Sequence, residues 1–192
     1  MAYKQHFVEW FSGKSLPSYW TQNITNGSLA MADEVDGGVL LSNDAVSWKR
    51  VSINFNDKRQ YAHDGSVSIG IVKRNTTNSI SMFGFSSGDT HGSLIQGCLY
   101  FDDSTETYKQ LNTGNGSSGS STVSDVAVST DWTSVKTELD ATNAYLSLGG
   151  VLKVTKSTLH PISKMQPICM NYGRASATAS SSSFRYMEAY NT

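Results

Sequence analysis

The chain has 192 residues, with 15 Lys and Arg against 16 Asp and Glu, so its formal net charge is −1 and 16% of its residues are charged. This balance argues against nucleic acid as a partner, because phosphate binding depends on a concentrated positive surface. No apolar run is long enough to cross a bilayer, and the opening MAYKQHFVEWF lacks the apolar core of a secretory signal, so we expect no membrane insertion. A chain of this length is most simply one domain, residues 1–192.

Strand-like alternation runs through almost the whole chain. In VSINFN (51–56) the apolar Val51, Ile53 and Phe55 alternate with polar residues, which is typical of a half-buried strand. Similar patterns predict strands over 66–72, 80–85, 97–101, 123–128, 132–139, 144–150, 151–157, 166–171 and 183–191. Between the first two strands, HDG at 63–65 predicts a hairpin tip, since Asp-Gly accepts positive φ. The recurring turn residues predict an all-β fold, an antiparallel β-sandwich.

Three details of this pattern carry separate expectations. NTGNGSSGSSTVS (112–124) is of low complexity, and we interpret it as a flexible Gly/Ser loop inside the domain. A short helical turn is expected near 158–164. In the last strand, alternation places Phe184, Tyr186 and Tyr190 on one face, and this aromatic face is interpreted as core.

Cysteine, histidine and acidic residues indicate neither a metal site nor a cofactor. Cys98 and Cys169 lie in strand-like surroundings and are predicted to be buried free thiols. The histidines lack the spacings of a zinc site: His6, His63, His91 and His160. FDDSTET (101–107), with Asp102, Asp103 and Glu106, is predicted to be a solvated loop, and a calcium site is the alternative.

Four stretches, taken together, carry the pattern of a known family. They are FSGKSLPSYWT, DEVDGGVLLS, DWTSVKTELDATNAYLSLGGVLKVTKS, and PICMNYG with SFRYMEAYN. In this order they resemble the opening strand, the second strand, a strand pair with a glycine hairpin, and the closing strands of concanavalin A-like jelly rolls. That superfamily includes lectins, laminin G domains and glucanases. The resemblance implies a jelly-roll sandwich whose last strand returns beside the first, and it looks most like domains of tailed-bacteriophage structural proteins.

The resemblance also supplies a test for catalysis. Glucanases of this kind carry Glu-x-Asp-x-(x)-Glu on one strand, which sets two carboxylates about 5 Å apart. Here Glu34 and Asp36 match the first half, but Gly38 or Val39 stands where the second Glu would fall. We therefore predict no catalytic residue and interpret MADEVDGGVLL as a polar turn that leads into a strand, residues 39–41, of the sandwich.

Sugar binding would require aromatic platforms beside polar side chains on an exposed face. Trp48, Tyr100 and Tyr108 are the candidates, because each lies next to charged or amide side chains. The alternative for each aromatic residue is a place in the core, and the tryptophans in particular, Trp10 among them, are expected to fill the core or cover a sheet edge.

The absence of a catalytic set and the resemblance together favour a protein that is not an enzyme. We expect a virion structural protein, a capsid decoration or head/tail-attached protein, that binds the major capsid protein or other virion proteins and forms a homo-oligomer. Its expected location is the virion. The alternative is a lectin-like carbohydrate-binding module for a cell-surface glycan, and a glycoside hydrolase is the third hypothesis.

Overall fold

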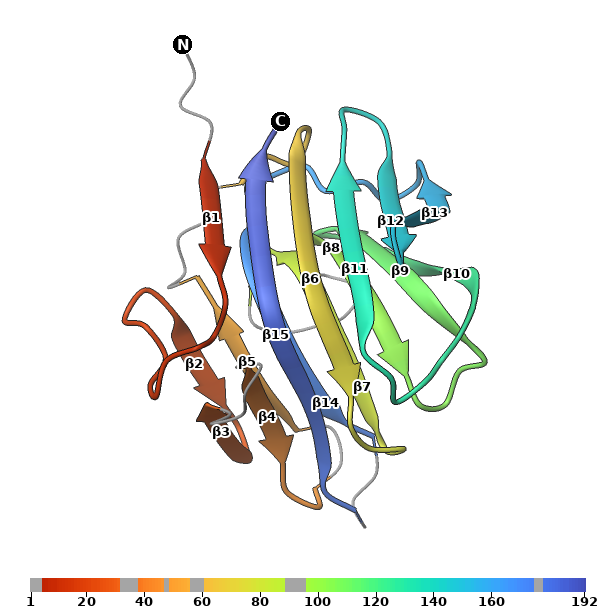
Figure 1. Ribbon diagram of the computed structural model, residues 1–192. Coiled ribbons are helices and arrows are strands. Elements are labelled where there is room, and N and C mark those ends of the chain that lie inside the picture. Colours follow the sequence, from red (N-terminus) through yellow and green to blue (C-terminus); the bar gives the residue numbers. More distant parts are fainter. Residues whose placement is uncertain (1–4, 32–37, 47–48, 56–60, 89–95, 175–177) are drawn as a thin grey trace.

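The computed structural model describes residues 5–31, 38–46, 49–55, 61–88, 96–174 and 178–192, which form two antiparallel β-sheets packed face to face (Figure 1). Within these residues, sheet A consists of β1 (His6–Glu9), β3 (Gly27–Met31), β4 (Val39–Asn43), β6 (Ser66–Arg74), β11 (Thr133–Leu139), β12 (Ala144–Leu148), β13 (Val151–Lys156) and β15 (Ser180–Asn191). Sheet B consists of β2 (Thr21–Ile24), β5 (Arg50–Asn54), β7 (Ser79–Ser86), β8 (Gln96–Asp103), β9 (Tyr108–Asn115), β10 (Gly119–Ala127) and β14 (Gln166–Gly173). The described residues contain no helix, and so none that could span a membrane.

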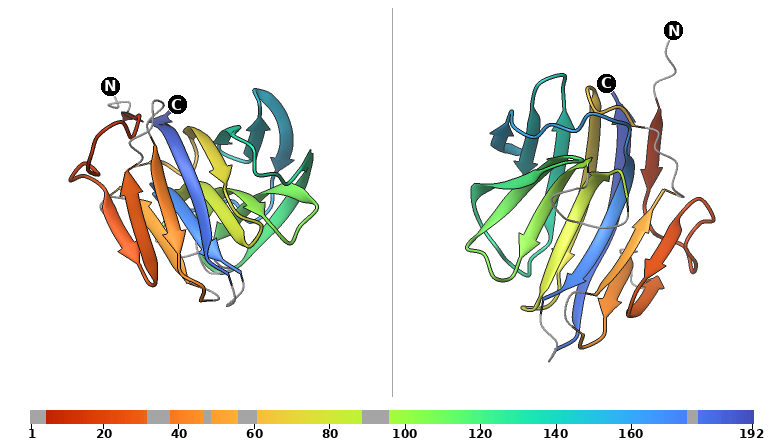
Figure 2. Two further views of the ribbon diagram at one scale, coloured as in Figure 1. Left: turned by 60° about the horizontal axis from the view of Figure 1, so that its bottom comes forward. Right: turned by 180° about the vertical axis from the view of Figure 1, so that it is seen from behind.

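The strand order shows how the chain moves between the sheets. Sheet A runs β13-β12-β11-β6-β15-β4-β3, and β1 pairs with the C-terminal half of β15. Sheet B runs β10-β9-β8-β7-β14-β5-β2 and lies in front in the right-hand view of Figure 2. Consecutive strands often lie in opposite sheets, as β5, β6 and β7 do. The predicted antiparallel sandwich is confirmed, and so is the return of the last strand beside the first.

The main core lies between the sheets and takes alternate residues from both. Val39 and Leu41 of β4 are fully buried in it, which confirms the predicted role of the strand that follows the Gly-Gly pair. Glu34 and Asp36 lie outside the described residues. Gly70 of β6 leaves room for Phe83 of β7, because a Cβ at Gly70 would lie 2.4 Å from that ring.

The glycine hairpin predicted near residue 150 is present between β12 and β13. Leu148 pairs with Val151, so Gly149 and Gly150 form a two-residue turn. Their φ angles are +59° and +81°, and two positive φ values in succession are what a type I′ hairpin turn requires. Glycine adopts these angles without the steric penalty that a Cβ would bring.

The hairpin predicted at 63–65 does not form. β5 pairs with β14 and β2 in sheet B, whereas β6 pairs with β11 and β15 in sheet A. The chain therefore crosses from one sheet to the other here, and Tyr61 forms a β-bridge with Met165 on the way. An Asp-Gly pair permits a tight turn, but the choice of strand partner depends on long-range packing.

The segment 112–124 is not a flexible loop but most of a β-hairpin. β9 and β10 pair from Gly119–Gly114 through Val123–Gln110. At the turn, Asn115 Oδ1 accepts hydrogen bonds from the backbone N–H groups of Ser117 and Ser118 at 3.0 and 2.9 Å. Low complexity described the composition correctly but did not exclude strand pairing. The helical turn expected near 158–164 is likewise absent, since these described residues form an irregular segment.

A β-bulge in β15 reverses the predicted orientation of its aromatic residues. Phe184 pairs with Val72 and Tyr186 with Ile71, so Arg185 is an extra residue in the strand. Phe184 faces the core as predicted. Beyond the bulge the core-facing positions are Met187 and Ala189, and Tyr186, Glu188 and Tyr190 point outward, which corrects the prediction that these tyrosines are core.

Both cysteines are buried and free, which confirms that prediction. Burial raises the pKa of Cys98 to about 12 and also raises the pKa of Cys169 well above its ordinary value. A raised thiol pKa means that both groups stay protonated at about pH 8, and the thiolate is the reactive form.

We expect DTNB to label neither thiol in the folded protein and both after unfolding in urea. Rapid labelling of either thiol before unfolding would contradict this packing.

Candidate functional site

The three aromatic residues predicted to bind sugar do not form one site. Trp48 lies outside the described residues. Tyr100 of β8 is 1% exposed, and its hydroxyl group donates to Asp102 Oδ2 at 3.3 Å. Tyr108, at the start of β9, is 42% exposed. Tyr100 is therefore a core residue, because β8 turns it inward, and it cannot be a surface platform. Ligand binding by Tyr108 stays a prediction.

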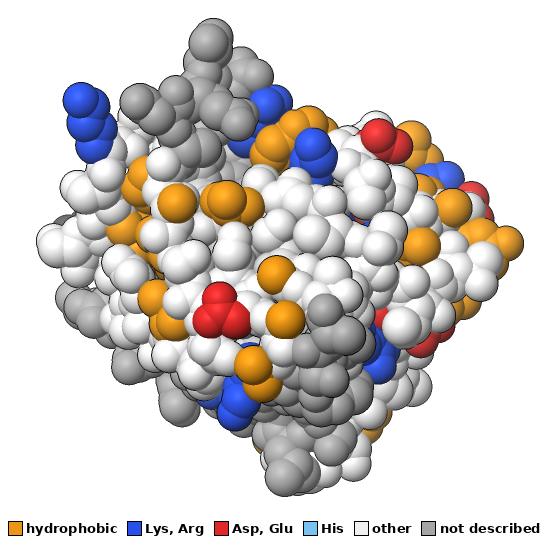
Figure 3. Space-filling view, turned by 90° about the horizontal axis from the view of Figure 1, so that it is seen from below, with side chains coloured by type: hydrophobic (Ala, Val, Ile, Leu, Met, Phe, Trp, Pro, Cys, Tyr) orange, Lys and Arg blue, Asp and Glu red, His pale blue; other side chains and the backbone are white. Residues whose placement is uncertain are grey.

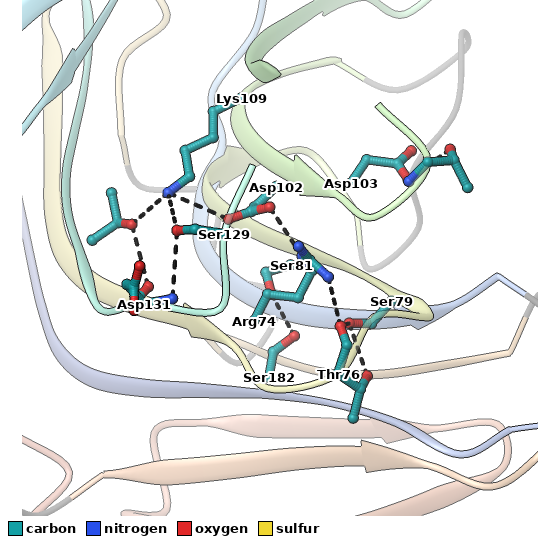
Figure 4. Close-up of polar contacts among 12 residues, drawn as sticks. Arg74, Thr76, Ser79, Ser81, Asp102, Asp103, Lys109, Ser129, Asp131 and Ser182 are labelled. Atoms are coloured by element: carbon teal, nitrogen blue, oxygen red, sulfur yellow. Dashed lines mark hydrogen bonds and ion pairs between the residues drawn. The ribbon is translucent and has the colours of Figure 1, made fainter. Parts of the chain in front are cut away.

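Asp102 belongs to a buried ionic cluster between the sheets (Figure 4). Its Oδ1 accepts a hydrogen bond from Arg74 Nε at 3.0 Å, and its Oδ2 lies 3.5 Å from Lys109 Nζ. Lys109 Nζ also donates to Ser129 Oγ and to Thr133 Oγ1, at 3.1 and 2.7 Å. Arg74 comes from sheet A, and Asp102 and Lys109 come from sheet B, so the cluster holds the two sheets together.

Asp103 points to the other side of β8. It pairs with Arg174, which donates to both of its carboxylate oxygens, and it accepts from the backbone N–H of Thr105 at 3.0 Å. Asp102 and Asp103 are both buried, so the prediction of a solvated loop is wrong for them. The two side chains point to opposite sides of β8, and each pairs with different cationic side chains. The described residues contain no group of three or more His, Cys, Asp or Glu side chains that could hold a metal ion.

The outer face of sheet B, which does not face sheet A, is unusually apolar. Outer faces of antiparallel sandwiches normally carry polar, solvated side chains. On the outer face of sheet B, apolar side chains instead form a second buried hydrophobic cluster, and Tyr172 packs against it. Its members are Ile80, Met82, Leu99, Phe101, Ile168 and Met170. The register aligns Met170, Met82 and Phe101 in one row across β14, β7 and β8.

Uncharged polar side chains flank this apolar cluster. On one side, Asn54 and Ser52 of β5 pair with Ile168 and Met170, and Gln166 lies on the same face of β14. On the other side, Gln110 and Asn112 of β9 extend the rows, and Tyr108 occupies the same face by alternation. The face thus combines an apolar floor with amide and hydroxyl groups along its margins. We call it the sheet B face, defined by the apolar cluster and by its flanking residues, Ser52, Asn54, Gln166, Tyr108, Gln110 and Asn112.

Several polar atoms of the sheet B face are buried without a hydrogen-bond partner. They are Nδ2 and Oδ1 of the Asn54 amide, Ser52 Oγ and Gln166 Oε1. A buried polar group left unpaired costs about 1–3 kcal/mol. Such groups are usually satisfied or functional, so their concentration on one sheet face marks it as the candidate functional site.

The carboxylates of the central strands bear on what chemistry this face could perform. A retaining glycosidase uses two carboxylates about 5 Å apart. Among the described residues of β5, β14, β7 and β8, the outward-pointing carboxylate is Asp103, which is paired with Arg174. Through its described residues, the sheet B face can therefore offer hydrogen bonds and apolar contacts to a neutral molecule.

The surface at one end of the sandwich is also weakly charged. Figure 3 shows the end of the sandwich that lies at the bottom of Figure 1. There the described side chains are mostly uncharged, and Lys, Arg, Asp and Glu are scattered instead of gathered in one patch. This distribution agrees with the low charged fraction of the sequence and offers no large charged surface in this view.

Comparisons with known proteins identify the fold. No protein-family model matches the chain, and no curated protein sequence does. A prokaryotic β-1,3-1,4-glucanase (lichenase) from a mouse hindgut metagenome has a similar structure, with a TM-score of 0.73 and 15% identity over 97% of this chain and 98% of the other. The Bacillus licheniformis β-glucanase gives a TM-score of 0.70 at 12% identity, covering 97% and 98%. The carbohydrate recognition domain of Emp47p gives 0.64 at 12% identity, covering 97% and 94%.

These similarities confirm the concanavalin A-like jelly roll expected from the sequence. They contradict the prediction that the protein is not an enzyme, because glycoside hydrolases are among the most similar structures and the architecture gives no ground for excluding catalysis. The structures named above are enzymes and a carbohydrate recognition domain, so the bacteriophage setting, the capsid partners, the homo-oligomer and the virion location stay predictions.

Proposed function

We propose that the protein binds a neutral carbohydrate through the sheet B face. The observation that carries this proposal is the set of buried, unpartnered polar atoms of Asn54, Ser52 and Gln166 beside a continuous apolar floor. A sugar ring presents hydroxyl groups at its edge and C–H groups on its faces, so it can satisfy both kinds of surface at once. The similarity of the fold to β-glucanases and to a carbohydrate recognition domain supports the same ligand class.

Different residues of the sheet B face would contact different parts of the sugar. The Asn54 amide can donate through Nδ2 and accept through Oδ1, and Gln166 Oε1 can accept from a ligand hydroxyl group. Met82 and Met170 supply flexible apolar contacts that adapt to the shape of a ring. Tyr108 is exposed at the β9 margin and can stack against a further sugar unit. Asn54, Gln166 and both methionines are buried, so ligand entry must expose them, and we expect association slower than about 10⁵ M⁻¹s⁻¹.

The first test replaces Asn54 by leucine, which has nearly the same shape. Asn54→Leu should weaken the binding of mixed-linkage β-1,3-1,4-glucan oligosaccharides about tenfold or more, because two hydrogen bonds to the ligand are lost. It should leave the urea midpoint of unfolding unchanged or raise it, since it removes two unpaired buried atoms. Isothermal titration calorimetry measures the first quantity and urea unfolding the second.

Asn75→Leu is the matched control for this test. Asn75 follows β6 of sheet A, outside the sheet B face, and its Nδ2 already donates to Ser183 Oγ at 2.8 Å. We expect its effect on affinity to be within about threefold. A reducing-end assay on the same oligosaccharides shows whether the bound sugar is also cleaved. Equal affinity of wild type and Asn54→Leu, or no binding across a panel that includes glucans and mannans, would overturn the proposal.

A further inference from the structure

The outer face of sheet A carries an exposed stripe of aromatic and polar side chains along β1 and β15. The two strands pair antiparallel, with His6 opposite Tyr190 and Val8 opposite Glu188. Trp10, just beyond β1, is 62% exposed, and the centre of its ring lies 4.5 Å from that of Tyr186. A tryptophan this exposed does not fill the core, which corrects that part of the expectation from the sequence.

The polar side chains of the stripe are held in place by one another. Glu188 Oε1 lies 2.8 Å from His6 Nε2, and Glu188 Oε2 accepts a hydrogen bond from the Tyr186 hydroxyl group at 2.6 Å. The hydrogen bond from Tyr186 lowers the pKa of Glu188, so this carboxylate is ionised at neutral pH. The His6 and Tyr190 rings pack edge to face, with their centres 5.8 Å apart.

A pocket of about 380 Å³ opens at the end of the stripe away from Trp10. The described residues that line it are His6, Glu188, Tyr190, Asn191 and Thr192. Outward-facing residues of a strand repeat at roughly 6.6 Å, so the pocket at His6 and the indole at Trp10 are roughly 13 Å apart. An aromatic platform at one end and hydrogen-bonding groups at the other suit an elongated ligand that lies along the strands.

We propose that this stripe is a second carbohydrate-binding site, for a linear oligosaccharide that stacks one sugar ring on Trp10 and places polar groups in the pocket at His6 and Glu188. It shares the ligand class of the proposed function but none of its residues. The two sites lie on opposite faces of the sandwich, so one molecule can hold two glycan chains at once and gain avidity on a polymer.

The composition of the stripe favours a sugar over a protein partner. Its large exposed hydrophobic side chains are Trp10 and Val8, whereas a standard protein interface buries about 800 Å² on each partner. An ionised carboxylate in the middle of the stripe would also be costly to bury against an apolar partner. A sugar hydroxyl group, by contrast, can donate to that carboxylate.

Tryptophan fluorescence and calorimetry with mixed-linkage β-1,3-1,4-glucan oligosaccharides and mannotriose test the proposal. Wild type should bind two oligosaccharides per chain, and Trp10→Ala should remove one of them or weaken it about tenfold or more. Trp10→Phe should retain part of this affinity but lose the change in tryptophan emission. Circular dichroism and the unfolding midpoint should not change, since Trp10 is mostly exposed.

Trp132→Ala is the matched control. Trp132 packs under the guanidinium group of Arg185, whose central carbon lies 4.1 Å from the ring centre, so its indole is already covered. We expect binding to this variant to equal that of wild type. Loss of binding in Trp10→Ala but not in Asn54→Leu would support the second site and overturn the site of the proposed function, and the reverse result would overturn only the second site. No binding of either probe, or a Trp10-dependent dimer in sedimentation, would overturn the inference.

Discussion

Asp102→Ala should lower the free energy of unfolding by about 3–5 kcal/mol. The side chain is buried with Arg74 and Lys109, and the carboxylate is the counter-charge for both cations. Its removal leaves two positive charges in the interior, and uncompensated buried charge is far more costly than the loss of one contact. Urea unfolding followed by circular dichroism measures the difference.

Two further variants make the Asp102 prediction specific. Asp125→Ala removes a carboxylate that is largely exposed and paired with Lys153, so we expect a change within about 0.5 kcal/mol. The triple variant Arg74→Met, Asp102→Leu and Lys109→Met removes all three charges together and should recover most of the stability that Asp102→Ala loses. A triple variant as unstable as Asp102→Ala would show that the lost packing, and not the unpaired charge, causes the effect.

Gly84→Ala is expected to cost about 2–6 kcal/mol, the sum of overpacking and backbone strain. Gly84 lies within β7, and a Cβ there would come 2.4 Å from the carbonyl oxygen of Cys98 on the neighbouring strand. Its φ of +138° is also a conformation that side chains with a Cβ rarely adopt. Either the pairing of β7 with β8 must loosen or the backbone must move, so thermal and urea unfolding should both report the loss.

Gly88→Ala is the control for Gly84→Ala. A Cβ at Gly88 would have no neighbouring atom within 4 Å, and we expect a change within about 0.5 kcal/mol. If Gly84→Ala were as stable as wild type, the close approach of β7 and β8 described here would be wrong.

Strand alternation predicted the facing of residues correctly in β5 and up to the bulge in β15. Val51 and Ile53 point into the core as the pattern of VSINFN indicated, and so does Phe184. The prediction failed for Tyr186 and Tyr190 because the extra residue Arg185 shifts the alternation by one position. A bulge has no fixed sequence marker, so the stripe on sheet A could not be recognised before the structure was known.

The acidic residues show a second limit of sequence reasoning. Asp102 and Asp103 are adjacent, and their composition alone suggested a solvated loop. Their burial depends on Arg74, which is 28 residues from Asp102, and on Arg174, which is 71 residues from Asp103. Only the three-dimensional arrangement of β6, β8 and the end of β14 brings these charges together.

Part of the sheet B face could have been recognised from the sequence. ISMFGF (80–85) and PICM (167–170) carry apolar residues on both alternating faces, which is typical of strands that are buried on both faces. The pattern indicates that the outer face of the sheet is covered. It does not indicate the flanking amides, because Asn54 and Gln166 come from strands more than a hundred residues apart and become neighbours only through the pairing of β5 with β14.

The side-chain amide signals of Asn54 and Gln166, in the nuclear magnetic resonance spectrum of the isotope-labelled protein, show whether the sheet B face binds carbohydrate. Both signals should shift during titration with a mixed-linkage β-1,3-1,4-glucan oligosaccharide and saturate with the Kd found by calorimetry, because both amides gain hydrogen bonds to the ligand. Signals of Asn54 and Gln166 that stay unchanged at saturation would show that carbohydrate does not bind at the sheet B face.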